Sequence, residues 1–181
     1  MATDSNNATA GASKGFSSAA TGGNSSPMKT PTARNRAAWI DYNGHMNVAY
    51  YVLAFDHATD TFLDHVGIDE NYRRATNCSV FVSETHVNYL RELREGASLA
   101  VTTQVLGLNE KRVHLFHQMY HAEDGYLAAS TDIIVVHVDL ERRRSVDWSG
   151  KPAEKLQQLH VTHREIPWPE KAGRHIGIKP G

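Results

Sequence analysis

The sequence predicts an α+β fold in which an antiparallel sheet packs against one long helix. One stretch carries an apolar stripe at helical spacing, and four later stretches alternate between apolar and polar residues. Short turns join most of these later stretches. Strands joined by short turns pair in an antiparallel way, and a helix with a single apolar stripe must bury it against another element. A sheet covered on one face by the helix satisfies all three observations.

Length and composition are those of one globular domain. The chain has 181 residues, of which 40% are hydrophobic and 22% charged, and its formal net charge is −1. This charge gives no general attraction to nucleic acid or to an anionic membrane. No window approaches the roughly 18 apolar residues of a membrane span, and no apolar stretch after Met1 resembles a secretory signal. We therefore predict a cytoplasmic protein with no nucleic-acid or membrane partner.

Three segments are expected along the chain. Residues 1–32 are nearly all small or polar, so they cannot bury enough apolar surface to offset the entropy of ordering, and we predict that they are disordered. A weak targeting peptide and a true start of translation at Met28 are two further interpretations of this segment. The folded domain is expected over residues 33–165. The proline-containing tail, residues 166–181, is expected to be irregular.

The first elements surround a short polar turn. A strand is predicted from Arg34 to Ile40, and the turn Asp41–Met46 follows it. Asn47 is a favourable N-cap for a helix from Val48 to about Val66, and Gly67 ends that helix. The apolar residues of this helix recur at intervals of three or four: Tyr51, Phe55, Ala58, Phe62 and Val66.

The later elements are a short helical turn at Glu70–Arg74 and then the strands of the sheet. The strands are predicted at Ser79–Tyr89, Ala97–Leu106, Arg112–His121 and Tyr126–Asp139. The last of them is apolar on both faces over Ile133–Val136, which is typical of a central strand. A short helix is predicted from Pro152 to His160, and His163 is expected to face solvent.

The predicted strand Ser79–Tyr89 carries polar residues where a half-buried strand should be apolar. Regular alternation places Phe81 and Val87 on one face and Val80 on the other. Glu84 lies close to His86 on this strand. Two interpretations have equal weight. Glu84 lines the active-site cleft as a second acid that contacts substrate, or this face of the strand is exposed to solvent.

The turn that leads into the long helix carries the candidate chemistry. The backbone N–H groups near Asn47 and Val48 lack intrahelical acceptors, and the helix dipole adds positive charge there. Such donors form an oxyanion hole when they face a carbonyl oxygen, and Gly44 lets the backbone approach a ligand. Asp41 would attack the carbonyl carbon or activate a water, and His45 would orient that water or donate to the carbonyl. A turn followed by a helix cap explains the same residues without any chemistry.

The segment Trp39–Tyr51 resembles the Asp-x-x-Gly-His-x-Asn-x-x-x-Tyr signature of hotdog-fold thioesterases similar to 4-hydroxybenzoyl-CoA thioesterase. The resemblance implies a hotdog fold, with Asp41 as the catalytic carboxylate and the backbone of Gly44–Val48 as the oxyanion hole. His45 and Asn47 match the same motif and complete the catalytic candidates. Further matches extend the resemblance over about residues 34–159.

Two positions depart from the family pattern. Trp39 stands where many members have a further Asp, and Glu92 replaces a proline in the second motif. These departures look closest to the branch that contains the betainyl-CoA thioesterases of carnitine breakdown. Because aromatic faces bind a trimethylammonium group, Trp39 or Tyr42 would line the acyl pocket. Filling of the core is the alternative role for the neighbouring Tyr51.

The reaction implied by the resemblance is hydrolysis of an acyl-CoA to a free acid and CoA. Coenzyme A enters as part of the substrate, and no metal or redox cofactor is implied. Arg91 and Arg94, or the cluster Arg142–Arg144, are candidates for binding its phosphates. The spacing of His114 and His117 does not indicate a metal site, because residues three apart on a strand face opposite sides.

A homodimer or larger homo-oligomer is expected, because the helix covers only one face of the predicted sheet. Two other functions remain possible. In an acyl-thioester dehydratase or hydratase, His45 would be the essential residue. In a non-catalytic acyl-CoA-binding protein, Asp41 would be only a helix cap.

Overall fold

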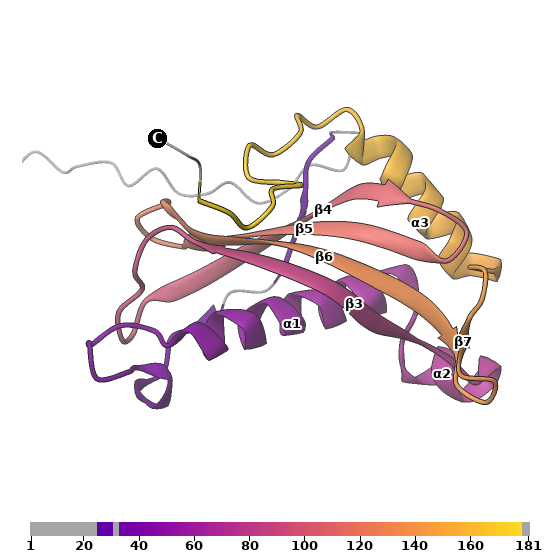
Figure 1. Cartoon of the computed structure of the whole chain (residues 1–181), viewed down its shortest axis with the longest axis horizontal. Helices are drawn as coiled ribbons and strands as arrows, with labels where there is room; N and C mark the ends of the chain where they lie inside the picture. Colours follow the sequence, from indigo (N-terminus) through magenta and orange to yellow (C-terminus); the bar gives the residue numbers. More distant parts are fainter. Residues whose placement is uncertain (1–24, 31–32, 179–181) are drawn as a thin grey trace, which may run out of the picture.

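The fold is a curved antiparallel sheet with helix α1 (Val48–Val66) along one face (Figure 1). This computed structural model describes residues 25–30 and 33–178, and the remaining residues lie outside the described part of the chain. Helix α3 (Gly150–His163) lies beside the long strand β4 (Ser98–Leu108). The predicted α+β arrangement is confirmed. No helix within the described residues is both long and apolar enough to cross a membrane.

The sheet runs in the order β1-β4-β5-β6-β3, and each pair is antiparallel. The further strands of this path are β1 (Met28–Lys29), β5 (Arg112–His121), β6 (Leu127–Asp139) and β3 (Cys78–Tyr89). Two short strands pair outside it, β2 (Ala33–Arg34) with β4 and β7 (Arg144–Ser145) with β6. The apolar run in β6 therefore lies between two neighbours, as its pattern predicts.

The N-terminal part differs from the prediction in two ways. Met28–Lys29, inside the segment predicted to be disordered, pairs with β4. The strand predicted from Arg34 to Ile40 is wrong beyond Arg34, because Ala37–Trp39 forms the 3₁₀ helix η1. The chain turns there so that the Trp39 carbonyl can accept a hydrogen bond from the Asn47 amide at 2.9 Å.

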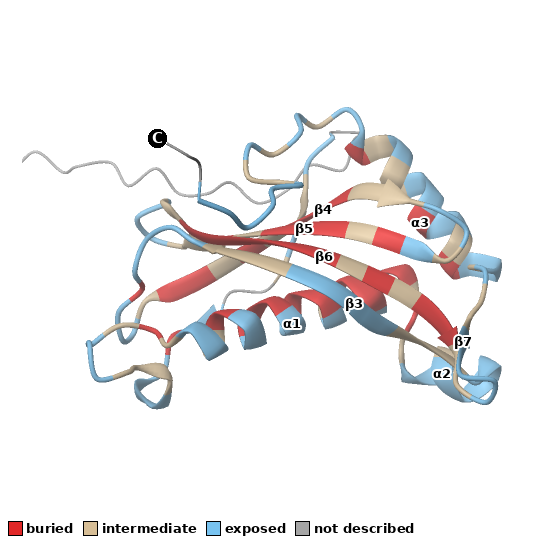
Figure 2. Cartoon of the chain, in the orientation of Figure 1, coloured by how far each residue is buried: buried red, intermediate tan, exposed pale blue. Residues whose placement is uncertain are grey.

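Helix α1 begins and ends where the sequence predicts. The side-chain oxygen of Asn47 accepts a hydrogen bond from the Ala49 amide at 3.0 Å, and Gly67 ends the helix with a φ of 88°. Every member of the predicted apolar stripe is buried against the sheet (Figure 2). Helix α2 (Glu70–Thr76) follows and reaches two residues beyond its predicted end at Arg74.

Strand β3 contains a bulge that regular alternation does not predict. The register against β6 shifts between Val82 and Glu84. Val80 before the bulge and Val87 after it both pack against core clusters beneath α1. The predicted assignment of these two valines to opposite faces is therefore wrong, because one extra residue in a strand reverses the faces of all that follow.

Helix α3 closes the β4 edge of the sheet and is longer than the predicted Pro152–His160. Leu156 is completely buried in the core cluster that contains Phe62 and Val66. His163 is also buried, and its Nδ1 accepts a hydrogen bond from the Val105 amide at 2.9 Å. The prediction that His163 faces solvent is wrong, because this side chain satisfies an edge amide that has no strand partner at that point.

One histidine lies in the core between α1 and the sheet. Nε2 of His117 is 3.1 Å from the Thr59 hydroxyl, and Nδ1 is 2.9 Å from the Thr103 hydroxyl. Burial lowers the pKa of His117 from 6.5 to about 3. The imidazole is therefore neutral in the fold, and it links α1 to β4 and β5.

This buried imidazole makes stability depend on pH. Between pH 6.5 and about 3 the unfolded chain protonates His117 while the folded chain does not, so stability is complete above pH 6.5 and is lost as the pH falls. We expect His117 to lower the unfolding free energy at pH 5 by about 2 kcal/mol relative to pH 7.5. Urea unfolding at both pH values measures this loss. His117→Gln should reduce the difference, and the exposed control His57→Gln should not. An equal loss in wild type and His117→Gln would assign the pH dependence to other groups.

Candidate active site

The turn before α1 holds the Asp41 carboxylate in place. Oδ1 of Asp41 accepts a hydrogen bond from the Asn43 amide at 2.8 Å. The Asp41 amide donates to the His45 carbonyl at 2.9 Å, and the Gly44 amide donates to the Asp41 carbonyl at 3.0 Å. Gly44 has a φ of 79°, which favours glycine at this position. The turn therefore fixes a half-buried carboxylate beside the first residues of α1.

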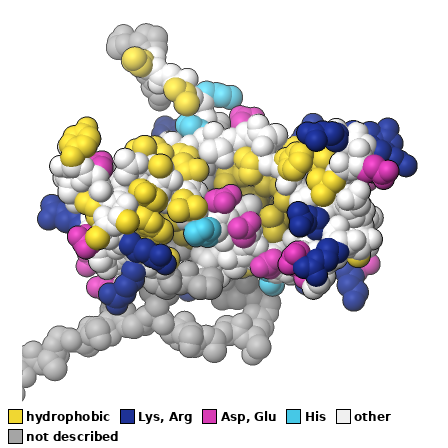
Figure 3. Space-filling view, turned by 90° about the horizontal axis from the view of Figure 1, so that it is seen from below, with side chains coloured by type: hydrophobic (Ala, Val, Ile, Leu, Met, Phe, Trp, Pro, Cys, Tyr) yellow, Lys and Arg dark blue, Asp and Glu magenta, His cyan; other side chains and the backbone are white. Residues whose placement is uncertain are grey.

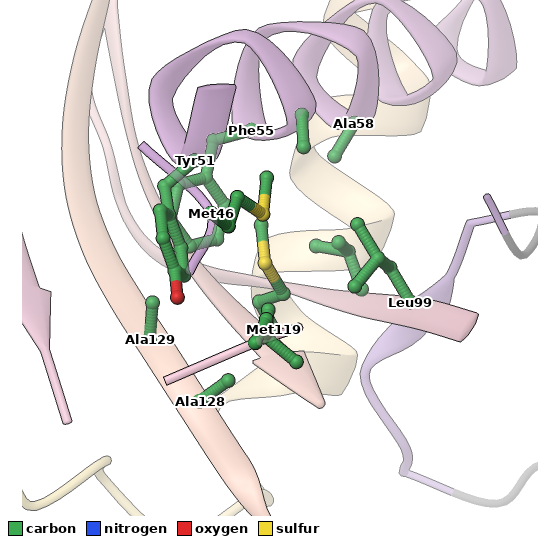
Figure 4. Packing of buried hydrophobic residues seen from close by; sticks show 11 residues of the cluster. Met46, Tyr51, Phe55, Ala58, Leu99, Met119, Ala128 and Ala129 are labelled. Carbon is green, nitrogen blue, oxygen red and sulfur yellow. The ribbon is translucent and has the colours of Figure 1, made fainter. Parts of the chain in front are cut away.

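The loop between β3 and β4 is hydrogen-bonded to this turn. The Met46 amide donates to the Leu93 carbonyl at 2.8 Å, and the Leu93 side chain is completely buried. Met46 packs beneath α1 beside Tyr51 and Met119 (Figure 4). Burial raises the pKa of the Tyr51 hydroxyl, while the adjacent Leu93 backbone acts in the opposite direction. Tyr51 thus fills the core, which was the alternative role considered for it.

Three of the amides at the helix start already have acceptors. The Asn47 amide donates to the Trp39 carbonyl, the Gly44 amide donates to the Asp41 carbonyl, and the Asn47 side chain caps Ala49. Val48 precedes the first intrahelical bond, and within the described part of the chain its amide has no acceptor. Of the two backbone positions predicted to stabilise an oxyanion, Val48 is therefore the one with a free donor in this conformation.

His45 is turned toward a residue that sequence reasoning did not place in the site. Its Nε2 lies 3.0 Å from Oε2 of Glu92, while Nη2 of Arg94 donates to Oε1 of the same carboxylate at 3.2 Å. No contact joins the side chains of His45 and Asp41 among the described interactions. The only signal for Glu92 in the sequence is that it replaces the proline of the family motif.

The two aromatic candidates for the acyl pocket differ in their surroundings. Trp39 stacks on Tyr50, with ring centroids 5.3 Å apart and an angle of 11° between the planes. The guanidinium of Arg36 lies 5.8 Å from the centroid of the same Trp39 ring. Tyr42 is 97% exposed. Of these two candidates, Trp39 is the one whose ring is held against another aromatic side chain.

The predicted CoA-binding arginines line a surface cavity of about 470 Å³ beside Glu92. The guanidinium of Arg91 lies 3.9 Å from the centroid of the Tyr126 ring, and Arg94 pairs with Glu92. The same cavity is lined by further carboxylates: Glu95, Glu123 and Asp124. Acidic side chains therefore surround both arginines, and their negative charge makes this cavity less suited to binding phosphates. Arg142–Arg144 lie around β7, where Arg142 is 3.8 Å from Asp139.

The structure does not bring Glu84 to Asp41 within one chain. Glu84 lies on the face of β3 opposite Val87, and so on the side of the sheet away from α1. It lines a cavity of about 160 Å³ with His86 and Asp132. The C-terminal tail reaches this cavity, where the Gly173 amide donates to Oδ1 of Asp132 at 3.1 Å. Part of the face that was expected to need a second subunit is thus covered by the tail.

An antiparallel sheet around one long helix is the arrangement of the hotdog fold, and here an anchored acid lies close to the N-terminus of that helix. The family model of the thioesterase-like superfamily matches residues 36–172. The chain therefore belongs to the thioesterase-like superfamily, and the predicted hotdog fold and hydrolase class are confirmed.

Two named proteins and one solved structure are similar to this chain over most of its length. A betainyl-CoA thioesterase of Pseudomonas aeruginosa is 40% identical over 142 residues, which cover 78% of this chain and 89% of that protein. An L-carnitine dehydrogenase/betainyl-CoA thioesterase of Rhizobium meliloti is 34% identical over 86% of this chain and 31% of its own length. A Staphylococcus aureus protein solved in complex with CoA has a TM-score of 0.79 and 27% identity, with coverage of 85% of this chain and 96% of that one.

Proposed function

We propose that the chain hydrolyses betainyl-CoA to betaine and CoA, with Asp41 as the catalytic carboxylate. The observation that carries the proposal is that one short segment holds both an anchored acid, Asp41, and the amide of Val48, which has no acceptor among the described residues. The proposed substrate is taken from the two named relatives, because both carry the betainyl-CoA thioesterase name. The proposed reaction needs no metal or redox cofactor, and coenzyme A takes part only as the leaving group.

Each residue has a defined task in this reaction. Asp41 accepts a proton from a water that attacks the thioester carbonyl carbon, or it attacks that carbon itself. The Val48 amide donates to the oxygen as negative charge develops on it, and the α1 dipole acts in the same direction. The carbon–sulfur bond then breaks, and the CoA thiolate leaves and takes up a proton. In the route through direct attack, water hydrolyses the resulting acyl anhydride.

Replacement of Asp41 by Asn tests the proposed role. The Asn side chain keeps an oxygen that can accept from the Asn43 amide, so the turn should survive while the base or nucleophile is lost. We expect thiol release from betainyl-CoA to fall by roughly 10²-fold or more, the size of a lost general base. The matched control is Asp147→Asn, near the other end of the sheet, which should leave turnover unchanged. Turnover unaffected by Asp41→Asn would move the chemistry away from this turn.

We assign recognition of the trimethylammonium group to Trp39. The Trp39–Tyr50 stack presents an aromatic surface beside Asp41, and the nearby Arg36 guanidinium already places a cation over the ring. Arg36 is itself exposed and can move aside. Thus an acyl group with a fixed positive charge would gain an interaction that a neutral one lacks.

A neutral isostere of the substrate tests this assignment. In 3,3-dimethylbutanoyl-CoA a carbon replaces the quaternary nitrogen, so the acyl group keeps its shape and loses its charge. We expect Trp39→Ala to reduce the kcat/KM preference for betainyl-CoA over this isostere by roughly threefold to thirtyfold, the range of one cation–π contact. Trp39→Phe should retain part of the preference. An unchanged ratio in Trp39→Ala would remove Trp39 from acyl recognition.

We also propose that two copies pair through β3. Among the described residues β3 pairs only with β6, so its other edge is open. Phe81 and Val82 are 52% and 51% exposed at the centre of this strand, the pale-blue stretch in Figure 2. Hydrophobic side chains also gather on the α1 side of the molecule (Figure 3), where Val52 is exposed. An open apolar edge is suited to pairing with its own copy about a two-fold axis.

Light scattering after size exclusion tests the pairing. The wild type should have twice the mass of the chain. Val82→Lys should shift the measured mass toward that of the monomer, because a charge would then be buried at the interface between the two copies. Val161→Lys changes an equally exposed valine on α3 and should leave the dimer intact. A wild-type monomer, or a dimer that survives Val82→Lys, would contradict pairing through β3.

A further inference from the structure

We infer that Glu92 is a positioning residue that acts on the reaction through His45. This inference rests on the proposed function, because it assigns His45 a task at the thioester. Glu92 does not touch the candidate nucleophile. Its carboxylate holds the imidazole, and the imidazole lies in the same turn as Asp41.

The contact fixes which ring nitrogen of His45 faces the reaction. Nε2 of His45 lies 3.0 Å from Oε2 of Glu92. A carboxylate is only an acceptor, so Nε2 carries the proton in this contact. Nδ1 is therefore the nitrogen left for a water or for the thioester carbonyl. A neutral imidazole would accept from a water at Nδ1, and a protonated one would donate from Nδ1 to the carbonyl oxygen.

The backbone around Glu92 is held at several points. The Tyr126 hydroxyl donates to the Glu92 carbonyl at 3.0 Å, and the Arg91 amide donates to the Ala128 carbonyl at 3.0 Å. On the other side, Nδ2 of the buried Asn35 donates to the Arg94 carbonyl at 2.9 Å. The loop that presents the carboxylate is thus set before substrate binds, which is the property expected of a positioning group.

The pair contributes little to the stability of the fold. The side chains of His45 and Glu92 are 33% and 52% exposed, and ion pairs with that much solvent contact add at most about 1 kcal/mol. A role limited to stability would therefore change the free energy of unfolding only slightly. Orientation of the imidazole would instead appear in turnover, because a misplaced catalytic group lowers the rate of the chemical step.

A double-mutant cycle separates the two roles. We expect Glu92→Gln to lower kcat for betainyl-CoA by roughly tenfold, because a hydrogen bond to a charged carboxylate becomes a weaker one to a neutral amide, with little change in KM. Glu92→Asp should recover part of the loss. In a His45→Gln background the same Glu92→Gln change should have almost no further effect, because its target is gone. Glu95→Gln, the same chemical change three positions further along the loop, is the matched control.

The tautomer of the imidazole gives a readout that does not depend on activity. In a ¹⁵N spectrum of the neutral His45 ring, the wild type should carry its proton on Nε2, and Glu92→Gln should lower the share of that tautomer, because the new amide can also donate to Nε2. Glu95→Gln should leave the tautomer unchanged.

The outcomes distinguish this inference from the proposed function. No thiol release by the wild type would overturn the proposed function, while the His45 tautomer would still decide whether Glu92 holds the ring. Equal kcat in wild type and Glu92→Gln, additive losses in the double variant, or a His45 tautomer that Glu92→Gln leaves unchanged would each overturn the inference. A tenfold loss that disappears in the His45→Gln background would support it.

Discussion

The hydrogen bond from the Met46 amide to the Leu93 carbonyl joins the two loops on which the site depends. Met46 ends the turn that carries Asp41, and Leu93 lies in the connection between β3 and β4 that carries Glu92. Both side chains are buried, so the bond is shielded from water at the edge of the core. The hydrogen bond therefore holds the residue before Asn47 and the start of α1 next to the loop that presents Glu92 to His45.

The hydrogen bonds of the turn also explain how a polar candidate site can lie on an apolar core. Three amides of the turn donate to the carbonyls of Trp39, Asp41 and His45, so these backbone groups are paired beside the core. The Val48 amide is left over because a helix cannot satisfy its first donors internally. The proposed reaction would thus use a carboxylate that the turn anchors and a donor that the start of the helix leaves unpaired.

Much of the fold was predictable because it depends on local periodicity. The stripe from Tyr51 to Val66 and the apolar run in β6 identify α1 and the central strand from residues close in sequence. The bulge in β3 and the buried His163 were not predictable, since they depend on partners in β6 and β4. The motif identified Asp41 as a candidate, whereas the pairing of His45 with Glu92 joins residues 47 positions apart, so only the folded chain shows it.

The central claim is that a thioester carbonyl is bound between Asp41 and the start of α1. A crystal structure with a non-hydrolysable ketone analogue of betainyl-CoA tests it most directly. We expect the ketone oxygen at about 2.7–3.1 Å from the Val48 amide nitrogen, with the carbonyl carbon facing the Asp41 carboxylate. A ketone bound in the cavity beside Glu84, on the other side of the sheet, would contradict a site at the start of α1.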